Sequence, residues 1–400
     1  MAWEKGVNIN NISTIICGSR VFLGVGAIEK MDFIAGELKA KGIDSIIAVT
    51  GKGAYAKTGA WDVVTKALDK HGIKYVLYNK VLPNPETHQV DEAVKVAQEA
   101  GAKAVIAIGG GSPIDAGKSV AILLEYPKNN CQELYEGAFS PVKAVPIIAI
   151  NLTHGTGSEA NRFAVVTIPE KEYKPPIAYD CIYPMYSIDD PALMTALPAD
   201  QTRYVSIDAV NHVVEGATTV LNNPFAMTLG KEVIRLVAKY LPVAIEKPGD
   251  LEARYFLTYA AMIAGTSFDN GLLHFTHALE HPLSGVKPEV THGLGLAILL
   301  PAVVKAIYPK AGVILADLLS DIVPGLTGDV GEAQKASDGV RAWLKSVGVP
   351  ERMGDLGFKK DDVPKLVKLA FETPTLQLLL DCSPVGCGAD IVEKIYTESF

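Results

Sequence analysis

The chain has 400 residues, of which 48% are hydrophobic and 20% charged, and its formal net charge is −8. This composition is typical of a globular enzyme rather than a disordered chain, and the length exceeds one ordinary core, so two domains are expected. The acidic balance argues against non-specific nucleic-acid binding and against an anionic membrane surface as a partner.

The N-terminus and the cysteines together predict a cytoplasmic protein. Residues 1–8 lack the basic-then-apolar order of a signal peptide. The apolar run at 12–16 is expected to be an exposed edge strand available for pairing. The five cysteines form no Cys-x-x-Cys pair, which argues against a sulfur-ligated zinc site and favours buried free thiols in a reducing compartment.

The first half of the chain alternates short apolar runs with helix-like stretches. Four runs are typical of buried strands, at residues 45–50, 74–78, 104–108 and 145–150, and a helical pattern such as that over 91–100 separates them. Continuous apolar strands that alternate with helices predict a parallel sheet covered by helices on both faces.

A glycine-rich turn follows the third expected strand. Gly109, Gly110, Gly111 and Ser112 stand where a strand ends and a helix begins, and the free N–H groups of a helix N-terminus favour phosphate. Asp115 lies three residues after Ser112, as in a capping box. This segment differs at one position from the ATP-binding P-loop pattern and at one position from the dinucleotide-binding Gly-x-Gly-x-x-Gly pattern. Because three successive glycines are rarely needed for turning alone, we interpret the segment as a phosphate-binding loop rather than a plain tight turn.

A polar loop, residues 151–159, follows the fourth expected strand and contains Thr153 and Thr156. Open parallel sheets bind ligands at the carboxyl ends of their strands, so this loop is expected to contact the same ligand. A polar loop without a binding role is the alternative.

Strand-like runs disappear beyond about Pro198, and helical periodicity dominates to the C-terminus. We therefore expect an α/β domain over residues 1–195 and an all-α domain over 196–400, with the active site in the cleft between them. The apolar stretch 294–304 is expected to be interrupted by Pro301 and too short to span a bilayer.

Histidines gather in the helical half of the chain. Asp208 and His212 lie four residues apart, which places both on one face of a helix. Four of the eight histidines follow, at positions 274, 277, 281 and 292. One carboxylate with several imidazoles suits iron or zinc, which needs three or four convergent ligands. The segment offers more imidazoles than such a site requires, so spacing alone does not identify the ligands, and a surface Asp with core histidines is the alternative.

Together these motifs resemble the iron-containing (group III) alcohol dehydrogenase family, a group related to glycerol dehydrogenase and dehydroquinate synthase, and especially its archaeal-type NADP-dependent members. The resemblance covers residues from about 20 to 390, and the matching motifs occur in the family's order: residues 109–115, residues 153–159, Asp208-x3-His212, His277-x3-His281 and His292-Gly293. The resemblance implies an N-terminal α/β dinucleotide-binding domain with a parallel sheet, an all-α C-terminal domain, and a homo-oligomer that is a dimer or larger.

The resemblance also implies a separate role for each of the clustered histidines. It implies Fe(II), or alternatively Zn(II), held by Asp208, His212, His277 and His292. His281 would then be the catalytic histidine that relays a proton to solvent, and His274 matches no ligand position and is expected on a helix face. The chain departs from the family pattern at residues 152–155, where Leu-Thr-His-Gly replaces Thr-Thr-Ala-Gly, and this bears on substrate preference.

The expected cofactor is NADP, with NAD as the alternative. An acidic residue after the second strand of a dinucleotide fold normally binds the ribose 2′-hydroxyl of NAD, whereas here Thr50 is followed by Gly51, Lys52 and Gly53. Glycine leaves room for a 2′-phosphate and Lys52 supplies a cation. By resemblance, Asn84 and Lys174 also line the cofactor cleft. The full expected set is Gly51, Lys52, Gly53, Asn84, Gly110, Gly111, Ser112, Asp115, Thr153, Thr156 and Lys174.

The implied activity is reversible hydride transfer between a primary alcohol or aldehyde and NAD(P). The alternatives are polyol oxidation of the glycerol dehydrogenase type, a lyase like dehydroquinate synthase, and a non-catalytic nucleotide-binding protein. The lyase is disfavoured because lysines and arginines do not cluster around the histidines. Four apolar residues are expected in the core, with a pocket lining as the alternative: Phe163, Phe268, Leu273 and Phe275.

Overall fold

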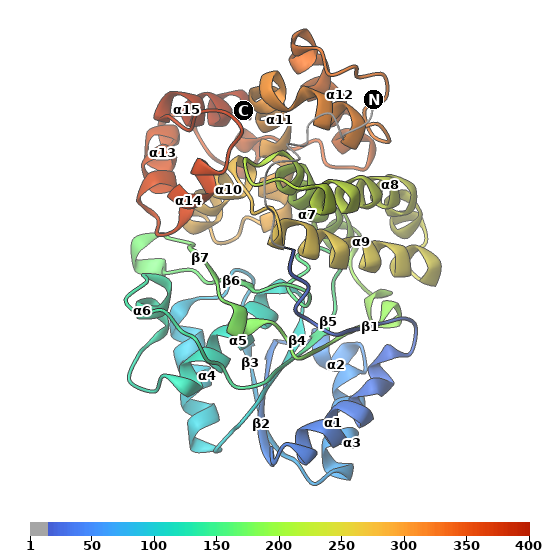
Figure 1. Ribbon diagram of the computed structural model, residues 1–400, viewed down its shortest axis with the longest axis vertical. Coiled ribbons are helices and arrows are strands. Elements are labelled where there is room, and N and C mark those ends of the chain that lie inside the picture. The colour runs from blue at the N-terminus through green and yellow to red at the C-terminus, as the bar shows by residue number, and fades with distance from the viewer. Residues whose placement is uncertain (1–14) are drawn as a thin grey trace.

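The computed structural model describes residues 15–400 and divides into a sheet part and a helical part (Figure 1). The sheet part contains six parallel strands in the order β1-β8-β5-β4-β2-β3. Their bounds are β1 Val21–Leu23, β2 Ser45–Gly51, β3 Lys74–Val81, β4 Val105–Gly109, β5 Ile147–Asn151 and β8 Tyr186–Asp189. Strands β2 to β5 are the four that the sequence predicts, and β1 and β8 are additional.

Helices cover both faces of the sheet, as predicted. In β2, Ile46 and Ala48 pack with α1 (Met31–Ala40) and α3 (Ala60–Lys70). Ile47 and Val49 alternate with them and pack with α4 (Thr87–Glu99) and α5 (Gly111–Glu125) on the opposite face. Successive side chains of a strand point to opposite faces, so a strand buried on both faces must be apolar at every position. The short helices α2 (Ala54–Lys57) and α6 (Cys131–Tyr135) complete this part.

An antiparallel hairpin, β6 (Phe163–Val165) and β7 (Pro176–Ala178), lies where the sheet part meets the helical part (Figure 1). It contacts the C-terminal helices, since Thr375 donates a hydrogen bond to the carbonyl of Pro176. This hairpin was not expected from the sequence. Its connecting segment carries Lys174 toward the other half of the molecule.

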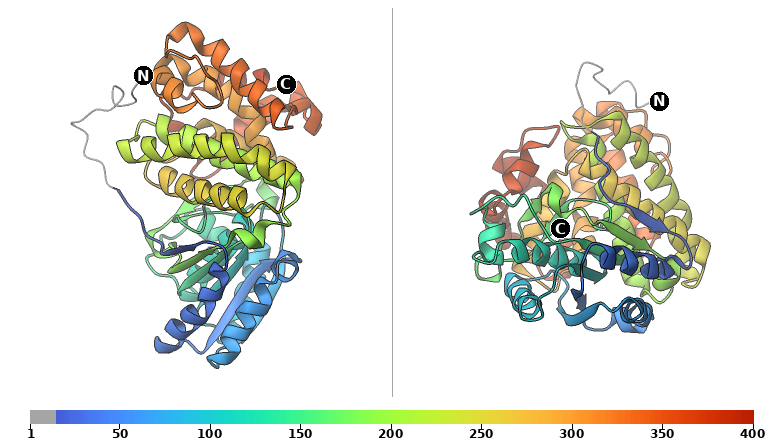
Figure 2. Two further views of the ribbon diagram at one scale, coloured as in Figure 1. Left: turned by 90° about the vertical axis from the view of Figure 1, so that its right-hand side faces the viewer. Right: turned by 60° about the horizontal axis from the view of Figure 1, so that its bottom comes forward.

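The helical part stacks on the carboxyl-end edge of the sheet (Figure 2). Its helices α7 to α15 all contribute side chains to one large apolar core. Their bounds are α7 Ala199–Thr218, α8 Pro224–Glu246, α9 Leu251–Asp269, α10 Phe275–Val286, α11 His292–Leu318, α12 Ala333–Ser346, α13 Val363–Glu372, α14 Leu376–Asp381 and α15 Ala389–Glu398.

Helix α11 corrects one expectation. It continues through Pro301 and Pro309 for 27 residues, and among the described helices it is the one long and apolar enough to cross a membrane. However, 72% of its apolar window is buried inside the protein, as in a core helix. Packing against α7, α10 and α12 outweighs the helix-breaking tendency of the prolines.

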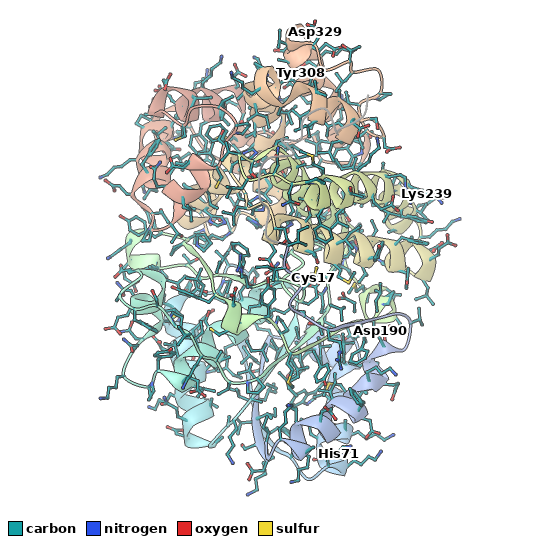
Figure 3. All side chains as sticks on the ribbon, in the orientation of Figure 1. Cys17, His71, Asp190, Lys239, Tyr308 and Asp329 are labelled. Carbon is teal, nitrogen blue, oxygen red and sulfur yellow. The ribbon has the colours of Figure 1, made fainter. Side chains whose placement is uncertain are left out.

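Two expectations about the N-terminal segment and the cysteines also change. Residues 12–14 lie outside the described part, and Ile15 and Ile16 form no strand, so the edge strands of the described six-stranded sheet are β1 and β3. The backbone of Ile16 instead pairs with the Asn270 side chain at the end of α9, through N···Oδ1 and Nδ2···O distances of 2.6 and 2.9 Å. The neighbouring Cys17, which is labelled in Figure 3, is exposed rather than buried.

Candidate metal and nucleotide site

A cavity of about 810 Å³ lies between the sheet part and the helical part. The expected cofactor residues line it, except Gly53, which does not. The four expected metal ligands and His281 line it as well. The structure thus brings together the motifs of both halves of the chain in one cleft.

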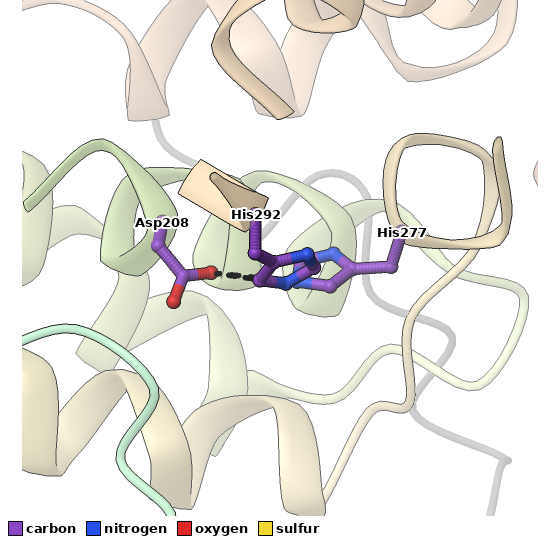
Figure 4. Close-up of side chains that lie close together, drawn as sticks. All are labelled: Asp208, His277 and His292. Atoms are coloured by element: carbon purple, nitrogen blue, oxygen red, sulfur yellow. Dashed lines mark ion pairs between the residues drawn. The ribbon is translucent and has the colours of Figure 1, made fainter. Parts of the chain in front are cut away.

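Three helices bring the expected metal ligands together. Asp208 and His212 lie one turn apart on α7, His277 lies in the first turn of α10, and His292 is the first residue of α11. The Asp208 Oδ1 atom is 3.4 Å from Nε2 of His212, 3.5 Å from Nε2 of His277 and 3.9 Å from Nε2 of His292. Figure 4 shows the carboxylate facing the imidazoles of His277 and His292.

This arrangement fits a divalent metal ion. The buried Oδ1 of Asp208 and Nε2 of His277 have no hydrogen-bond partner. Unpaired buried polar atoms are costly, and atoms that bind one metal at about 2.1 Å in a tetrahedron lie roughly 3.4 Å apart. Asp208, His277 and His292 present ligand atoms within 4.8 Å of one another. His212 falls outside that group of three, although it contacts Asp208 and its ring stacks on His277 at 4.6 Å.

Two buried glutamates that the sequence analysis missed orient these imidazoles. Glu215 Oε1 accepts a hydrogen bond from His277 Nδ1 at 2.7 Å, and Glu280 accepts one from His292 Nδ1. A carboxylate at Nδ1 holds the proton on that nitrogen and leaves the Nε2 lone pair for a metal. The available signal was spacing, because Glu215 follows His212 by three residues and Glu280 follows His277 by three.

The site carries several buried negative charges. Burial opposes ionisation of the Asp208 carboxyl, but His212 and the other imidazoles outweigh it and lower its pKa to about 2. For Glu215, burial is likewise outweighed by His277, and the pKa falls to about 2. Burial also works against the Glu280 charge, yet His292 and Lys174 hold the pKa of that carboxyl well below its usual range. All three are ionised at neutral pH, which favours a cation between them.

The other two histidines of the segment differ from the ligands. His281 is buried, its Nδ1 has no partner, and its ring centroid lies 5.8 Å from that of His292. Burial and the Lys174 charge keep its pKa well below the ordinary value, so it is neutral. His274 does not lie on a helix face as expected. It caps α10, accepting from the Phe275 amide through Nδ1, and its Nε2 bonds Thr218 Oγ1 at 2.9 Å.

The glycine-rich loop and the loop after β5 contact each other directly. A Cβ on Gly110 would lie 2.8 Å from Thr153 Oγ1, and one on Gly111 would lie 2.5 Å from Thr156 Cγ2. Helix α5 begins at Gly111, and its N-cap, Gly110, supplies no side-chain cap. The first amides of α5 therefore remain available to a phosphate at the cavity wall.

The expected capping box in this loop is wrong. Asp115 lies within α5, where its half-buried carboxylate accepts hydrogen bonds from Ser158 Oγ at 2.5 Å and from the Val165 amide at 3.0 Å. It thus ties the start of α5 to the loop after β5 and to β6. Burial raises the pKa of this carboxyl to about 6, against the opposing charge of Lys118.

Some of the apolar residues belong to both the core and the cavity wall. Phe268, Leu273 and Phe275 are buried in the helical core, as expected, and Phe268 and Leu273 also line the cavity together with the half-buried Phe163. Phe268 stacks on His212 with ring centroids 4.4 Å apart, and Phe163 packs on Phe268 at 5.2 Å. The metal-ligand cluster therefore has an apolar wall on one side.

A parallel sheet that offers helix amides to a nucleotide, facing a carboxylate–imidazole cluster across one cleft, defines a nucleotide- and metal-dependent enzyme. The family description "Iron-containing alcohol dehydrogenase" matches residues 18–191, and "Fe-containing alcohol dehydrogenase family, C-terminal" matches residues 202–399. The chain belongs to the iron-containing alcohol dehydrogenase family, and it is an oxidoreductase that interconverts alcohols and aldehydes.

Individual relatives agree with this assignment. A long-chain primary alcohol dehydrogenase of Thermoanaerobacter ethanolicus is 56% identical over 398 residues and covers 100% of both chains. The structure of an archaeal halo-thermophilic alcohol dehydrogenase from a Red Sea brine pool matches with a TM-score of 0.91 and 28% identity, covering 98% of this chain and 100% of that one. An NADH-dependent butanol dehydrogenase of Thermotoga maritima matches with a TM-score of 0.86 and 30% identity, covering 97% and 98%. These likenesses favour the dehydrogenase over the lyase and the non-catalytic alternatives.

Proposed function

We propose that this protein is an NADP-preferring dehydrogenase of apolar primary alcohols, with iron held by Asp208, His212, His277 and His292. The observation that carries the proposal is the set of three Nε2 atoms 3.4 to 3.9 Å from Asp208 Oδ1, a buried atom without a hydrogen-bond partner at the wall of the cavity. Nitrogen and oxygen ligands also accept zinc, so the choice of iron rests on the family. Among residues 15–400, β1 lies at one edge of the sheet and pairs with β8 alone, and this edge supports a homo-oligomer.

When bound, the metal supplies Lewis acidity toward the substrate oxygen, and the nicotinamide cofactor supplies hydride exchange. Glu215 and Glu280 hold the His277 and His292 rings in the tautomer that presents Nε2. His281 is the proposed proton relay, because it lines the cavity beside His292 and its buried Nδ1 has no hydrogen-bond partner in the described structure.

The apolar residues of the cavity wall support an apolar substrate. Phe163, Phe268, Leu273 and Leu379 line the cavity beside the histidines. Such side chains exclude water and contact an alkyl chain, and each buried methylene contributes about 0.8 kcal/mol. The 56% identical relative is named as a long-chain primary alcohol dehydrogenase, in agreement with this substrate class.

The end of β2 supports NADP. Gly51 and Lys52 line the cavity there, the Lys52 side chain is exposed, and no acidic side chain follows the strand. An exposed ion pair between Lys52 and a 2′-phosphate is worth up to about 1 kcal/mol, which corresponds to roughly a fivefold preference.

The test is a reductase assay on protein loaded anaerobically with Fe(II), using NADPH or NADH and straight-chain aldehydes of increasing length. We expect kcat/KM to be roughly fivefold higher with NADPH, and to rise by up to about fourfold per methylene until the cavity is filled. Equal efficiency with NADH would contradict the cofactor preference. A preference for glycerol and dihydroxyacetone would favour polyol oxidation, and no turnover of any substrate would contradict the proposal as a whole.

A further inference from the structure

The metal ligand His292 is held differently from the others. Its side chain is 24% exposed, whereas those of Asp208, His212 and His277 are at most 5% exposed. It is the first residue of α11, directly after the α10–α11 loop, residues 287–291. The other three ligands lie within α7 and α10, so the position of His292 depends on what fixes this loop.

Asn84 of the sheet part fixes the loop from across the cleft. Its Nδ2 donates to the carbonyl oxygens of Pro288 at 3.1 Å and Val290 at 3.4 Å. Asn84 is buried and has a φ of 54°, in the left-handed region that asparagine tolerates better than most residues. This backbone conformation directs the side-chain amide of Asn84 toward the α10–α11 loop.

Lys174, from the hairpin connection between β6 and β7, reaches the same region. Its Nζ lies 2.9 Å from Ser284 Oγ, 3.3 Å from Glu280 Oε2 and 3.4 Å from His292 Nδ1. Both Lys174 and Glu280 are buried. The ammonium balances the carboxylate that accepts the Nδ1 proton of His292, so it keeps that carboxylate in place as an acceptor.

We propose that Lys174 and Asn84 are positioning residues for the metal ligand His292, so that the sheet part completes a metal site carried by the helical part. The two residues, which the resemblance assigns to the cofactor cleft, direct their hydrogen bonds to Ser284, Glu280 and the α10–α11 loop. The inference rests on the metal site of the proposed function. If Asn84 and Lys174 position His292, the affinity of the site for its metal depends on hydrogen bonds that cross the cleft from the sheet part to the helical part.

The test measures the metal dissociation constant by competition with a chelator and, separately, the NADPH dissociation constant by fluorescence. Lys174→Gln and Asn84→Gly are each expected to weaken Zn(II) or Fe(II) binding, measured in the absence of nucleotide, by about tenfold or more. Lys174→Arg retains the charge and is expected to restore most of the metal affinity. Unchanged metal affinity together with weakened NADPH binding would overturn the inference and return both residues to the cofactor.

Lys365→Gln is the matched control. Lys365 on α13 pairs with Glu172 of the same hairpin connection at 2.6 Å, so it also joins the two parts, but on the surface. We expect this variant to bind metal as the wild type does, and equal weakening would overturn specific positioning in favour of general loosening. Asn84→Gly keeps the left-handed backbone accessible and carries the test if Lys174→Gln does not fold. A wild-type protein that binds neither metal would contradict the proposed function instead.

Discussion

The histidines of residues 274–292 have separate partners, and these partners account for their separate roles. His274 bonds Thr218, His277 bonds Glu215, His292 bonds Glu280, and Nδ1 of His281 has no partner. Spacing in the sequence was enough to predict the cluster. Spacing could not assign a role to each histidine, because their partners Glu215 and Thr218 lie on α7, about 60 residues earlier in the chain.

The contrast between His281 and His277 gives a prediction. His281→Ala is expected to keep the metal and to lower kcat by about 10²- to 10⁴-fold, the usual contribution of a general acid–base group. His277→Ala is expected to lose the metal as well as activity, because its Nε2 lies 3.5 Å from Asp208 Oδ1. Metal analysis beside kcat on both purified variants checks this. Release of metal from His281→Ala would show that it is a ligand.

The loop after β5 is held against two helices by glycines. A Cβ on Gly155 would lie 2.7 Å from Val205 of α7, and one on Gly157 would lie 2.5 Å from Gly265 of α9. This loop carries Thr153 and Thr156 at the cavity wall, and α7 carries Asp208 three residues beyond Val205. The close contact therefore fixes the nucleotide loop relative to the metal ligands.

Gly155→Ala tests this packing. The added methyl meets the Val205 side chain and carbonyl, so either the loop or α7 must move. We expect a loss of about 1–3 kcal/mol in the free energy of unfolding, as for other overpacked interiors. Gly249→Ala is the control, because no atom lies within 4 Å of its Cβ position. Urea unfolding of both variants gives the comparison, and equal midpoints would contradict the tight contact.

Local patterns in the sequence predicted the long elements and missed the short ones. Strands β2 to β5 follow from continuous apolar runs, because burial on both faces demands an apolar residue at each position. Strands β1 and β8 have three and four residues, and β8 contains Ser187 and Asp189, so neither gives a periodic signal. The local sequence pattern predicted a break in helix α11 at Pro301, because proline is a helix breaker. In the structure α11 is buried in the helical core, and this packing keeps the helix continuous through Pro301.

A buried hydrogen-bond network joins the sheet part to the helical part. Arg254 of α9 is fully buried and donates to His154 Nε2 and to Thr202 Oγ1, each at 2.9 Å. Because arginine only donates, His154 accepts at Nε2 and carries its proton on Nδ1, 3.2 Å from Ser206 Oγ. His154 is one of the residues at which the chain departs from the family pattern, and this departure was expected to bear on substrate preference. In the structure His154 makes interior hydrogen bonds and does not line the cavity.

This network predicts a pH dependence of stability. Burial, together with the charge of Arg254, lowers the pKa of His154 from 6.5 to about 3. Below pH 6.5 the His154 imidazole therefore binds a proton in the unfolded chain but stays neutral in the folded protein. The free energy of unfolding consequently falls as pH falls. Between pH 7 and pH 5 this one group costs about 2 kcal/mol.

His154→Gln keeps an acceptor and a donor but does not titrate. Its free energy of unfolding, measured in urea at pH 7 and at pH 5, is expected to fall by about 2 kcal/mol less than that of the wild type over this interval. An identical decrease in both proteins would mean that His154 is protonated in the folded state.

The burial of α11 has a consequence for how the chain is made. A ribosome completes this helix at Leu318, but α12 and α15, which pack on it, follow in the chain, and α15 ends only at Glu398. At the usual rates of translation that interval lasts roughly 4 to 16 s. During it a helix as apolar as a membrane span lacks part of its cover, which is the kind of surface that chaperones shield. The C-terminal helices thus act as the final cover of the helical core, and a chain ending before Ala389 would leave α11 permanently open to aggregation.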